Sequence, residues 1–461
     1  MSRKLSYLLL GTGCALGLSL QSASATVRQV GGCTTNPLQY GTIQAAVNAS
    51  NSGDSVQICP GTYPEQVVVS QAMTLTNVSH MPSPTVTIPS GGAVQNTTTL
   101  YGFPAAAQIL VAPSTPAKVN VKNLIVDGSG NNINSCNMEL FGIYYQNAGG
   151  TISGDAAQNQ LLPPADQGCQ NGEGIFVESQ TTGTPQLNIT GNSVTNFDKN
   201  AITVSYGAAF SDIENNTVTG MGPTTVIAQN GIQLGYGASG HVLNNMVSDM
   251  SYTPGSYGAT GILLYDTQTG SLPNPTVSGN TVSSVQYGIV LEAVNGTAGH
   301  MVAVGSNGIS GAQFAGIGLY SAGAGYGNDY IKVTNNTVDG TNPYDDIDVC
   351  SDYNTIHGNT VSNSAEGGIH LDGLCTESDN STSGLHNTVS TNQIDTNCVG
   401  ILSGPPPGAN NIERNNVFNG NTNNYEYGTD SYSCGPHAAR RPGASRRGSA
   451  KAIGPVQPLA H

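Results

Sequence analysis

Hydrophobic residues recur along this chain in two short phrases that alternate with each other. The first is an N-x-V phrase, in which Val or Ile follows two residues after Asn192, Asn216, Asn245, Asn280, Asn307, Asn336, Asn359, Asn392 and Asn415. The second is a G-I-x-L type strand, with its isoleucine at Ile202, Ile232, Ile262, Ile289, Ile317, Ile347, Ile369 and Ile401. The phrases stay constant while the gaps between them vary, which predicts a solenoid with a fixed core and loops of changing length.

The spacing within each phrase predicts strands. Val and Ile at alternate positions point inward and stack between successive turns, while the residues between them face water. The repeated Asn can hydrogen-bond to its equivalents above and below, which satisfies backbone groups at the turn. Strand crossovers are overwhelmingly right-handed. The pattern therefore predicts an all-β fold, a single-stranded right-handed parallel β-helix.

A different pattern precedes the array. Thr42 can cap a short helix in which Ile43, Ala46 and Val47 share one face. Strand-like segments follow at 55–59 and 66–69, with a Pro-Gly turn between them. An open solenoid end needs a cover, so we expect this helix to cap the stack.

The segment 42–69 also carries a family resemblance. Its phrases TIQAAVNA, Gly53-Asp54 and ICPGTYPEQVVV resemble the first turn of pectinesterases and other pectin-lyase-like β-helix proteins, and the later repeats resemble the NosD-type β-helix repeat. The resemblance implies the right-handed β-helix. Enzymes and non-enzymes share these phrases, so it implies no particular chemistry.

Composition divides the chain into three parts. Residues 1–25 have a basic start, an apolar core and an Ala23-Ser24-Ala25 cleavage site, which are typical of a signal peptide. Residues 26–434 form the β-helix domain, and 435–461 form a basic tail that we expect to be disordered. No later apolar run is long enough for a membrane span. We therefore predict a secreted or periplasmic protein.

The cysteines agree with an oxidising compartment. Nine occur, and removing Cys14 with the signal leaves eight, an even number. Pairing nearest neighbours gives Cys33–Cys59, Cys136–Cys169, Cys350–Cys375 and Cys398–Cys434. Eight cysteines allow many pairings, and we favour Cys33–Cys59 and Cys350–Cys375.

Charge limits the partners. Residues 26–434 contain six of the 13 basic residues but all 28 acidic ones. Phosphate binding needs clustered Lys and Arg, so the composition argues against nucleic acid. A polyanionic polysaccharide is repelled as well, unless a divalent cation bridges it.

Chemistry-bearing residues gather late in the array. The positions one and three after each strand isoleucine share the outer face of one sheet. Near the end these positions include Glu292, Asp348, His370 and Asp372. Successive turns lie about 4.8 Å apart, so the last three are within side-chain reach. Paired carboxyls can hydrolyse glycosides and a histidine can carry a proton, so these four are candidate catalytic residues.

Two further sets are candidates. Asp345, Asp346 and Asp352 can hold Ca²⁺, which prefers several oxygen ligands. Tyr265 and Tyr320, at outer positions of the same sheet, can stack on sugar rings. The plain alternative for all of them is a solvated face without function, since Asp and Asn are common in turns.

Two functions remain open. No catalytic set of a related family transfers: the GHG and R-I-K segments of polygalacturonases, the GxxDFxFG phrase of pectinesterases and clustered Met and His for copper are all missing. We therefore favour an exported protein that binds polysaccharide or serves as a surface structural module. The alternative is a polysaccharide hydrolase, Ca²⁺-dependent lyase or epimerase that uses the acidic stripe.

Overall fold

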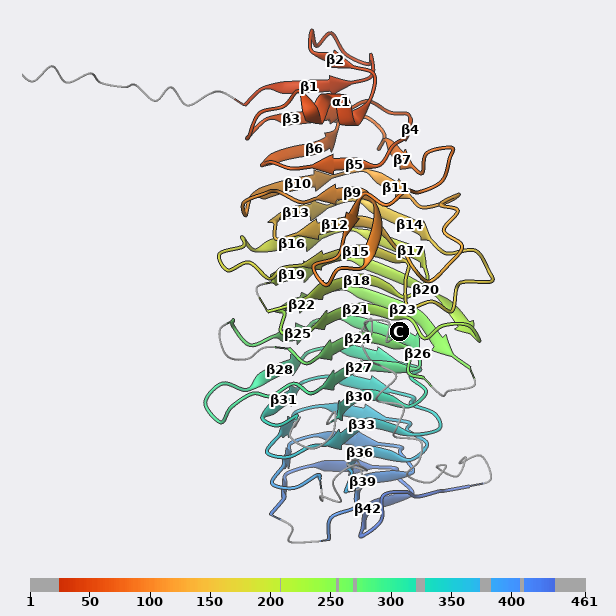
Figure 1. Ribbon diagram of the computed structural model, residues 1–461. Coiled ribbons are helices and arrows are strands. Elements are labelled where there is room, and N and C mark those ends of the chain that lie inside the picture. Colours follow the sequence, from red (N-terminus) through yellow and green to blue (C-terminus); the bar gives the residue numbers. More distant parts are fainter. Residues whose placement is uncertain are drawn as a thin grey trace, which may run out of the picture.

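The computed structural model describes residues 25–435, apart from 208, 254–256, 268–271, 321–327, 374–382 and 407–409. In this part of the chain one solenoid carries three parallel sheets along its length (Figure 1). The predicted parallel β-helix is confirmed. Residues 1–24 of the predicted signal peptide and the predicted tail beyond Gly435 lie outside the described residues.

The first sheet has 15 strands in the described part of the chain. They are β1 (Val27–Val30), β2 (Gln39–Tyr40), β3 (Ser55–Ile58), β6 (Met73–Asn77), β10 (Lys118–Lys122), β13 (Gly149–Ser153), β16 (Leu187–Thr190), β19 (Phe210–Glu214), β22 (Ser239–Leu243), β25 (Thr276–Ser278), β28 (Val302–Gly305), β31 (Ile331–Thr334), β34 (Thr355–His357), β37 (Thr388–Ser390) and β40 (Ile412–Arg414).

The second sheet has 13 strands among the same residues. They are β4 (Thr62–Pro64), β7 (Thr85–Thr87), β11 (Ile125–Asp127), β14 (Ala156–Gln160), β17 (Ser193–Phe197), β20 (Thr217–Thr224), β23 (Met246–Tyr252), β26 (Thr281–Val285), β29 (Gly308–Ser310), β32 (Thr337–Asp339), β35 (Thr360–Ser362), β38 (Gln393–Asp395) and β41 (Val417–Asn419).

The third sheet carries the predicted candidate residues. Its parallel strands are β5 (Val67–Val69), β9 (Pro104–Val111), β12 (Glu139–Gln146), β15 (Glu173–Glu178), β18 (Asn200–Ser205), β21 (Asn230–Gly235), β24 (Thr260–Tyr265), β27 (Tyr287–Glu292), β30 (Ala315–Tyr320), β33 (Asp345–Cys350), β36 (Gly367–Leu371), β39 (Val399–Ser403) and β42 (Asn423–Tyr427). The short strand β8 (Thr97–Thr98) pairs antiparallel with β9.

Stacked aliphatic side chains form the core. Ile262, Ile289, Ile317 and Ile347 are register partners on successive strands, and all four are fully buried. Burying one such side chain contributes about 1.5–3 kcal/mol, so the repeated phrase supplies the main cohesive energy of each turn.

The predicted asparagine ladder is present. The backbone N and side-chain Nδ2 of Asn280 both donate to Oδ1 of Asn307 at 2.9 Å, and Nδ2 also donates to the Val242 carbonyl at 2.8 Å. The same contacts link each member of the series from Asn192 to Asn392 to the next. Every donor at this buried corner is therefore satisfied within the solenoid.

The last member of the ladder differs from the prediction. Asn392 donates to Oδ1 of Asn416, not of Asn415. Phe418 takes the inward position opposite Ile394, which places the preceding asparagine of the phrase at 416. Val417, which suggested Asn415, is exposed.

The capping helix is confirmed. Helix α1 (Ile43–Asn48) begins after Thr42, whose side chain accepts a hydrogen bond from the Ala45 backbone N at 3.1 Å. Ile43 and its apolar neighbours on the same face join the main core. This is the only helix in the described part of the chain, and it is far too short to cross a membrane.

Three disulfides are present among the described residues: Cys33–Cys59, Cys136–Cys169 and Cys398–Cys434. The favoured pair Cys33–Cys59 is therefore confirmed. Cys350 is disulfide-bonded as well, and its predicted partner Cys375 lies outside the described residues.

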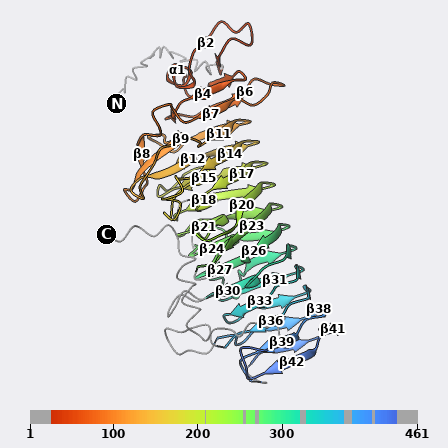
Figure 2. The ribbon, with the colours of Figure 1, turned by 90° about the vertical axis from the view of Figure 1, so that its right-hand side faces the viewer.

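One expectation about the third sheet is wrong. Its outward positions were expected to face water, but most strands from β9 to β39 are buried on both faces. Part of this cover comes from segments outside the repeat. The hairpin of β8 and β9 lies beside β12 (Figure 2), and residues 430–432 contact strands near the other end.

Candidate functional site

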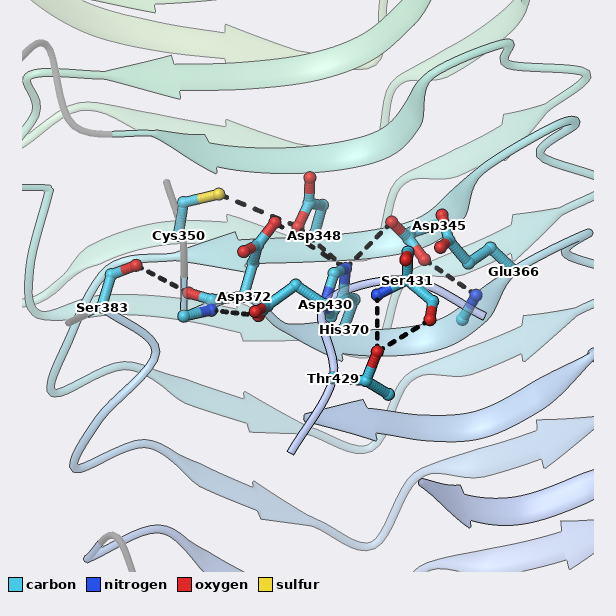
Figure 3. Close-up of polar contacts among 12 residues, drawn as sticks. Asp345, Asp348, Cys350, Glu366, His370, Asp372, Ser383, Thr429, Asp430 and Ser431 are labelled. Carbon is cyan, nitrogen blue, oxygen red and sulfur yellow. Dashed lines mark hydrogen bonds and ion pairs between the residues drawn. The ribbon is translucent and has the colours of Figure 1, made fainter. Parts of the chain in front are cut away.

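The outer face of the third sheet brings the predicted catalytic residues into adjacent positions. Asp348 on β33 pairs in register with His370 on β36, as the repeat predicted. Nδ1 of His370 lies 3.1 Å from Asp345 Oδ2, 3.6 Å from Asp348 Oδ1 and 4.0 Å from Asp372 Oδ2. We call these four residues the His370 cluster (Figure 3).

Neighbouring strands and one distant segment position the cluster. The Gly367 backbone N donates to Asp345 Oδ1 at 2.8 Å, which fixes that carboxyl beside the imidazole. Asp430, from the segment after β42, lies against the His370 and Asp372 side chains and accepts from the Gly373 backbone N at 2.6 Å. Burial raises the pKa of Asp430, and the nearby carboxyl of Asp372 raises it further.

Electrostatic balance in the cluster depends on one imidazole. The side chains of His370, Asp345 and Asp372 have no exposed surface, and that of Asp348 is 8% exposed. Because Nδ1 faces three carboxyls, a proton on this nitrogen is the state that they stabilise. The imidazole is thus the basic group on which the buried carboxyls converge.

Tyr320 connects this cluster to the preceding strands. Its hydroxyl donates to Asp348 Oδ2 at 3.1 Å. The ring lies across Gly318, where a Cβ atom would fall 2.3 Å from the ring carbon Cε2. A side chain at position 318 would therefore exclude the ring from its place beside Asp348.

Glu292 and Tyr265 occupy the next outer positions. Glu292 stands in register between Tyr265 and Tyr320, and burial raises its pKa to about 8. Tyr265, Tyr287 and Tyr320 are half-buried and pack over the outward side chains of Leu263 and Val290. We call the three tyrosines the aromatic patch. The structure places Glu292 beside this patch and separates it from His370 by two strands.

Family models match two overlapping parts of the chain. Residues 124–338 match a model described as "Right handed beta helix region", and residues 271–434 match "Periplasmic copper-binding protein (NosD)". The chain is a right-handed parallel β-helix protein. None of the curated proteins compared with it matches significantly.

Solved β-helix structures resemble this β-helix protein at low identity. The A-module of the Azotobacter vinelandii mannuronan C-5 epimerase AlgE4 is 14% identical, with 85% of this chain and 95% of that chain covered and a TM-score of 0.43. XylC in complex with xylose is 11% identical, with 86% of both chains covered and a TM-score of 0.49. The catalytic domain of a GH87 α-1,3-glucanase is 11% identical, with 86% and 69% covered and a TM-score of 0.48.

The predicted calcium ligands of the β-helix protein do not converge. Asp346 faces away from Asp345 and accepts from the Thr341 backbone N at 3.2 Å. Asp352 accepts from the Leu385 backbone N at 2.8 Å and is not among the described groups close enough to share an ion. Ca²⁺ prefers six to eight oxygen ligands, so the set Asp345, Asp346 and Asp352 does not fit it.

The His370 cluster fits a copper ion no better. It offers one histidine and no methionine, whereas copper prefers imidazole and soft sulfur ligands. Cys350 lies 3.9 Å from Asp348 Oδ1, but its sulfur is part of a disulfide and provides no thiolate.

Sequence reasoning missed a second acidic group, nearer the N-terminal end of the same face. Glu139, Glu173 and Glu178 come from β12 and β15 and line a pocket under the β8–β9 connection. Burial raises the pKa of each to about 8. The available signal was EGIFVE, a strand with a carboxyl at both ends. We call this site the glutamate pocket.

Proposed function

We propose that this β-helix protein is exported and binds a polysaccharide on the outer face of the third sheet, at the aromatic patch. The carrying observation is the row of half-buried Tyr265, Tyr287 and Tyr320 beside the carboxyls of Glu292 and Asp348. The disulfides support export, because they persist in oxidising compartments.

The aromatic patch suits a sugar chain. A phenol ring offers an apolar face to the C–H side of a sugar and a polar tip to its hydroxyls. The β-helix domain is strongly acidic, so a neutral glycan meets no long-range repulsion there. We therefore propose a neutral polysaccharide as the ligand.

Burial favours binding over catalysis at this face. A general acid or base must come within hydrogen-bond reach of the proton that it transfers. His370, Asp345 and Asp372 have fully buried side chains, whereas the aromatic patch is partly exposed. Recognition by the patch therefore needs no rearrangement of the cluster.

A glycan array and affinity electrophoresis on neutral polysaccharides test the proposal. We expect Tyr265→Ala and Tyr320→Ala each to weaken retention about tenfold, the loss of one stacking contact of about 1 kcal/mol or more. Tyr353→Ala is the matched control, because Tyr353 is 43% exposed but stacks on Tyr330 and His386 away from the patch. Equal retention of all three variants and the wild-type protein would contradict the proposal.

Catalysis is the second candidate, and Asp348 is the observation that favours it. Its carboxyl retains a small exposed area, accepts from Tyr320 and lies beside His370, an arrangement that can hold or release a proton. Purified protein assayed on neutral and acidic polysaccharides, with and without Ca²⁺, tests this function. Activity that is lost in Asp348→Asn would support it, and activity that survives this change would place the chemistry elsewhere.

A further inference from the structure

The glutamate pocket is a built cavity with aromatic walls. Thr99, Tyr101 and Phe103 cover it from the β8–β9 connection, and Phe141, Phe176 and Tyr206 line it from the third sheet and its edge. The Phe141 and Phe176 rings stack with centroids 4.6 Å apart, and Tyr101 and Tyr206 meet at 4.0 Å. The cavity volume is about 70 Å³, counted as the space open to the centres of water-sized spheres, which admits a small organic group.

Buried carboxyl oxygens in this pocket lack hydrogen-bond partners. All contacts of Glu178 reach Oε1, which accepts from the Leu100 backbone N at 2.6 Å and from the Tyr144 hydroxyl. Its Oε2 has no partner, nor has Oε2 of Glu139. Neither oxygen of Glu173 receives a well-formed hydrogen bond, although Thr203 and Lys199 lie close enough to offset part of its desolvation. These three side chains are at least 93% buried, so each open oxygen is costly without a ligand.

The spacing of the carboxyls argues against a single metal ion. Their oxygens do not all approach within 4.8 Å of one another, in contrast to the ligand atoms of Asp345, Asp348 and His370. A ligand that reaches several of them must be larger than an ion. Aromatic faces attract organic cations, and desolvated carboxylates complement the same charge.

We propose that the glutamate pocket binds an organic ammonium group, held between the tyrosine rings and the carboxyls of Glu139, Glu173 and Glu178. The cation would give the open carboxyl oxygens a partner of opposite charge. The ammonium of Lys199 does not occupy this role, because it is bound to the Ala228 carbonyl at 2.9 Å. This inference goes beyond the proposed glycan binding and does not depend on it.

The affinity of the glutamate pocket for a cation should depend on pH, because its carboxyl groups and the nearby lysine titrate near neutrality. Glu139, Glu173 and Glu178 have pKa values raised to about 8 by burial, and burial lowers the pKa of Lys199 to about 8. The phenols that face them, Tyr206 and Tyr236, have pKa values raised by burial and stay neutral. A cation favours ionised carboxylates, so its affinity should rise as pH increases from 6 towards 8.

Calorimetric titration of the full-length protein with choline tests the proposal. Choline carries a charge that does not titrate, and its isostere with carbon in place of nitrogen is the matched neutral probe. We expect choline to bind at least about tenfold more tightly than the isostere, with affinity rising from pH 6 to 8. Equal binding of both probes, or no binding of choline at about 10 mM to folded protein, would overturn the proposal.

Variants locate the site. Glu178→Gln keeps the shape and the acceptor for Leu100 but removes the charge, and we expect about a tenfold loss of choline affinity. Tyr101→Ala should weaken binding several-fold, whereas Tyr257→Ala should not, because both side chains are 51% exposed but only Tyr101 lines the pocket. Choline affinity unchanged by both Glu178→Gln and Tyr101→Ala would also overturn the proposal. Glycan retention, measured on the same proteins, reports separately on the aromatic patch.

Discussion

The His370 cluster and the glutamate pocket lie on the same face of the third sheet, with β18, β21, β24, β27 and β30 between the strands that carry their carboxyls. Both bury several carboxyls, but they balance the charge differently. The His370 cluster surrounds one imidazole with acids at 3.1 to 4.0 Å. In the glutamate pocket the carboxyls are spread apart and burial raises the pKa of each.

A sheet of stacked strands can therefore accommodate buried carboxyl groups in two ways. Where a basic side chain occupies the adjacent register position, the acids converge on it. Where none does, they stay protonated near neutrality and leave an opening. Four changes test this difference between the two sites.

Replacing His370 should have the largest effect on stability. His370→Ala leaves Asp345, Asp348 and Asp372 buried without the imidazole that they share, and we expect the free energy of unfolding to fall by about 3–5 kcal/mol. Chemical denaturation measures this change. His241→Ala is the control, because the His241–Asp212 pair is partly exposed and should contribute at most about 1 kcal/mol. A similar small loss for both variants would mean that the cluster is not held by the imidazole.

The glutamate pocket should make the folded protein more stable at low pH than at high pH. A salt-bridged carboxylate has the opposite effect, because it loses its charge in acid. The folded protein holds protons on Glu139, Glu173 and Glu178 up to about pH 8, whereas the unfolded chain releases them near the ordinary pKa of 4.5. Between these values the folded state binds more protons, so stability falls as pH rises and levels off above pH 8. Melting temperatures from pH 5 to 9 measure the slope. Glu178→Gln should reduce it, and an unchanged slope would contradict the assigned pKa.

Removing the lysine beside the pocket should cost much less than removing His370. Glu173 is mostly protonated at pH 6, so Lys199→Met leaves no buried unpaired charge there, and we expect a change within about 1 kcal/mol. Burial lowers the pKa of Lys199 to about 8, so at pH 9 the wild-type lysine is mostly neutral and the fold no longer bears the cost of its buried charge. The loss on removing the lysine should therefore be larger at pH 9. Urea denaturation at the two pH values tests this dependence, with Lys332→Met on an exposed position as the control.

The smallest expected effect on stability concerns Gly318. Gly318→Ala places a Cβ atom against the Tyr320 ring, which can swing outward, so we expect a loss of about 1 kcal/mol. The tyrosine should lose its hydrogen bond to Asp348, and polysaccharide retention should fall as in Tyr320→Ala. Gly308→Ala meets no atom within 4 Å and serves as the control. Retention equal to that of the wild-type protein would show that Tyr320 needs no fixed position.

Sequence periodicity predicted most of the fold because every turn must bury aliphatic side chains and satisfy the buried polar groups at its corner. The inward isoleucines and the buried asparagines obey one spacing, so their register followed directly, including the adjacency of Asp348 and His370. The assignment of Asn415 failed where the inward residue changed from an aliphatic side chain to Phe418.

The contacts that complete the two sites could not be predicted, because they come from segments outside the repeat. Asp430 reaches Asp372 from beyond the last strand, and Tyr101 reaches Tyr206 from a hairpin outside the array. Nothing in local spacing indicates which turn such a segment covers. Glu178 lies three residues after Ile175, at an outward position of the repeat, but its burial follows from those covers and not from the repeat.

The asparagine ladder has a consequence for how such a protein can change in length. Each asparagine contacts only the members directly above and below it, through the same pair of hydrogen bonds at every step. Deleting or duplicating one complete turn therefore restores an identical junction, and the energetic penalty stays local. The distance along the axis between the two acidic sites can then be altered in whole-turn increments of about 4.8 Å, without redesign of either site.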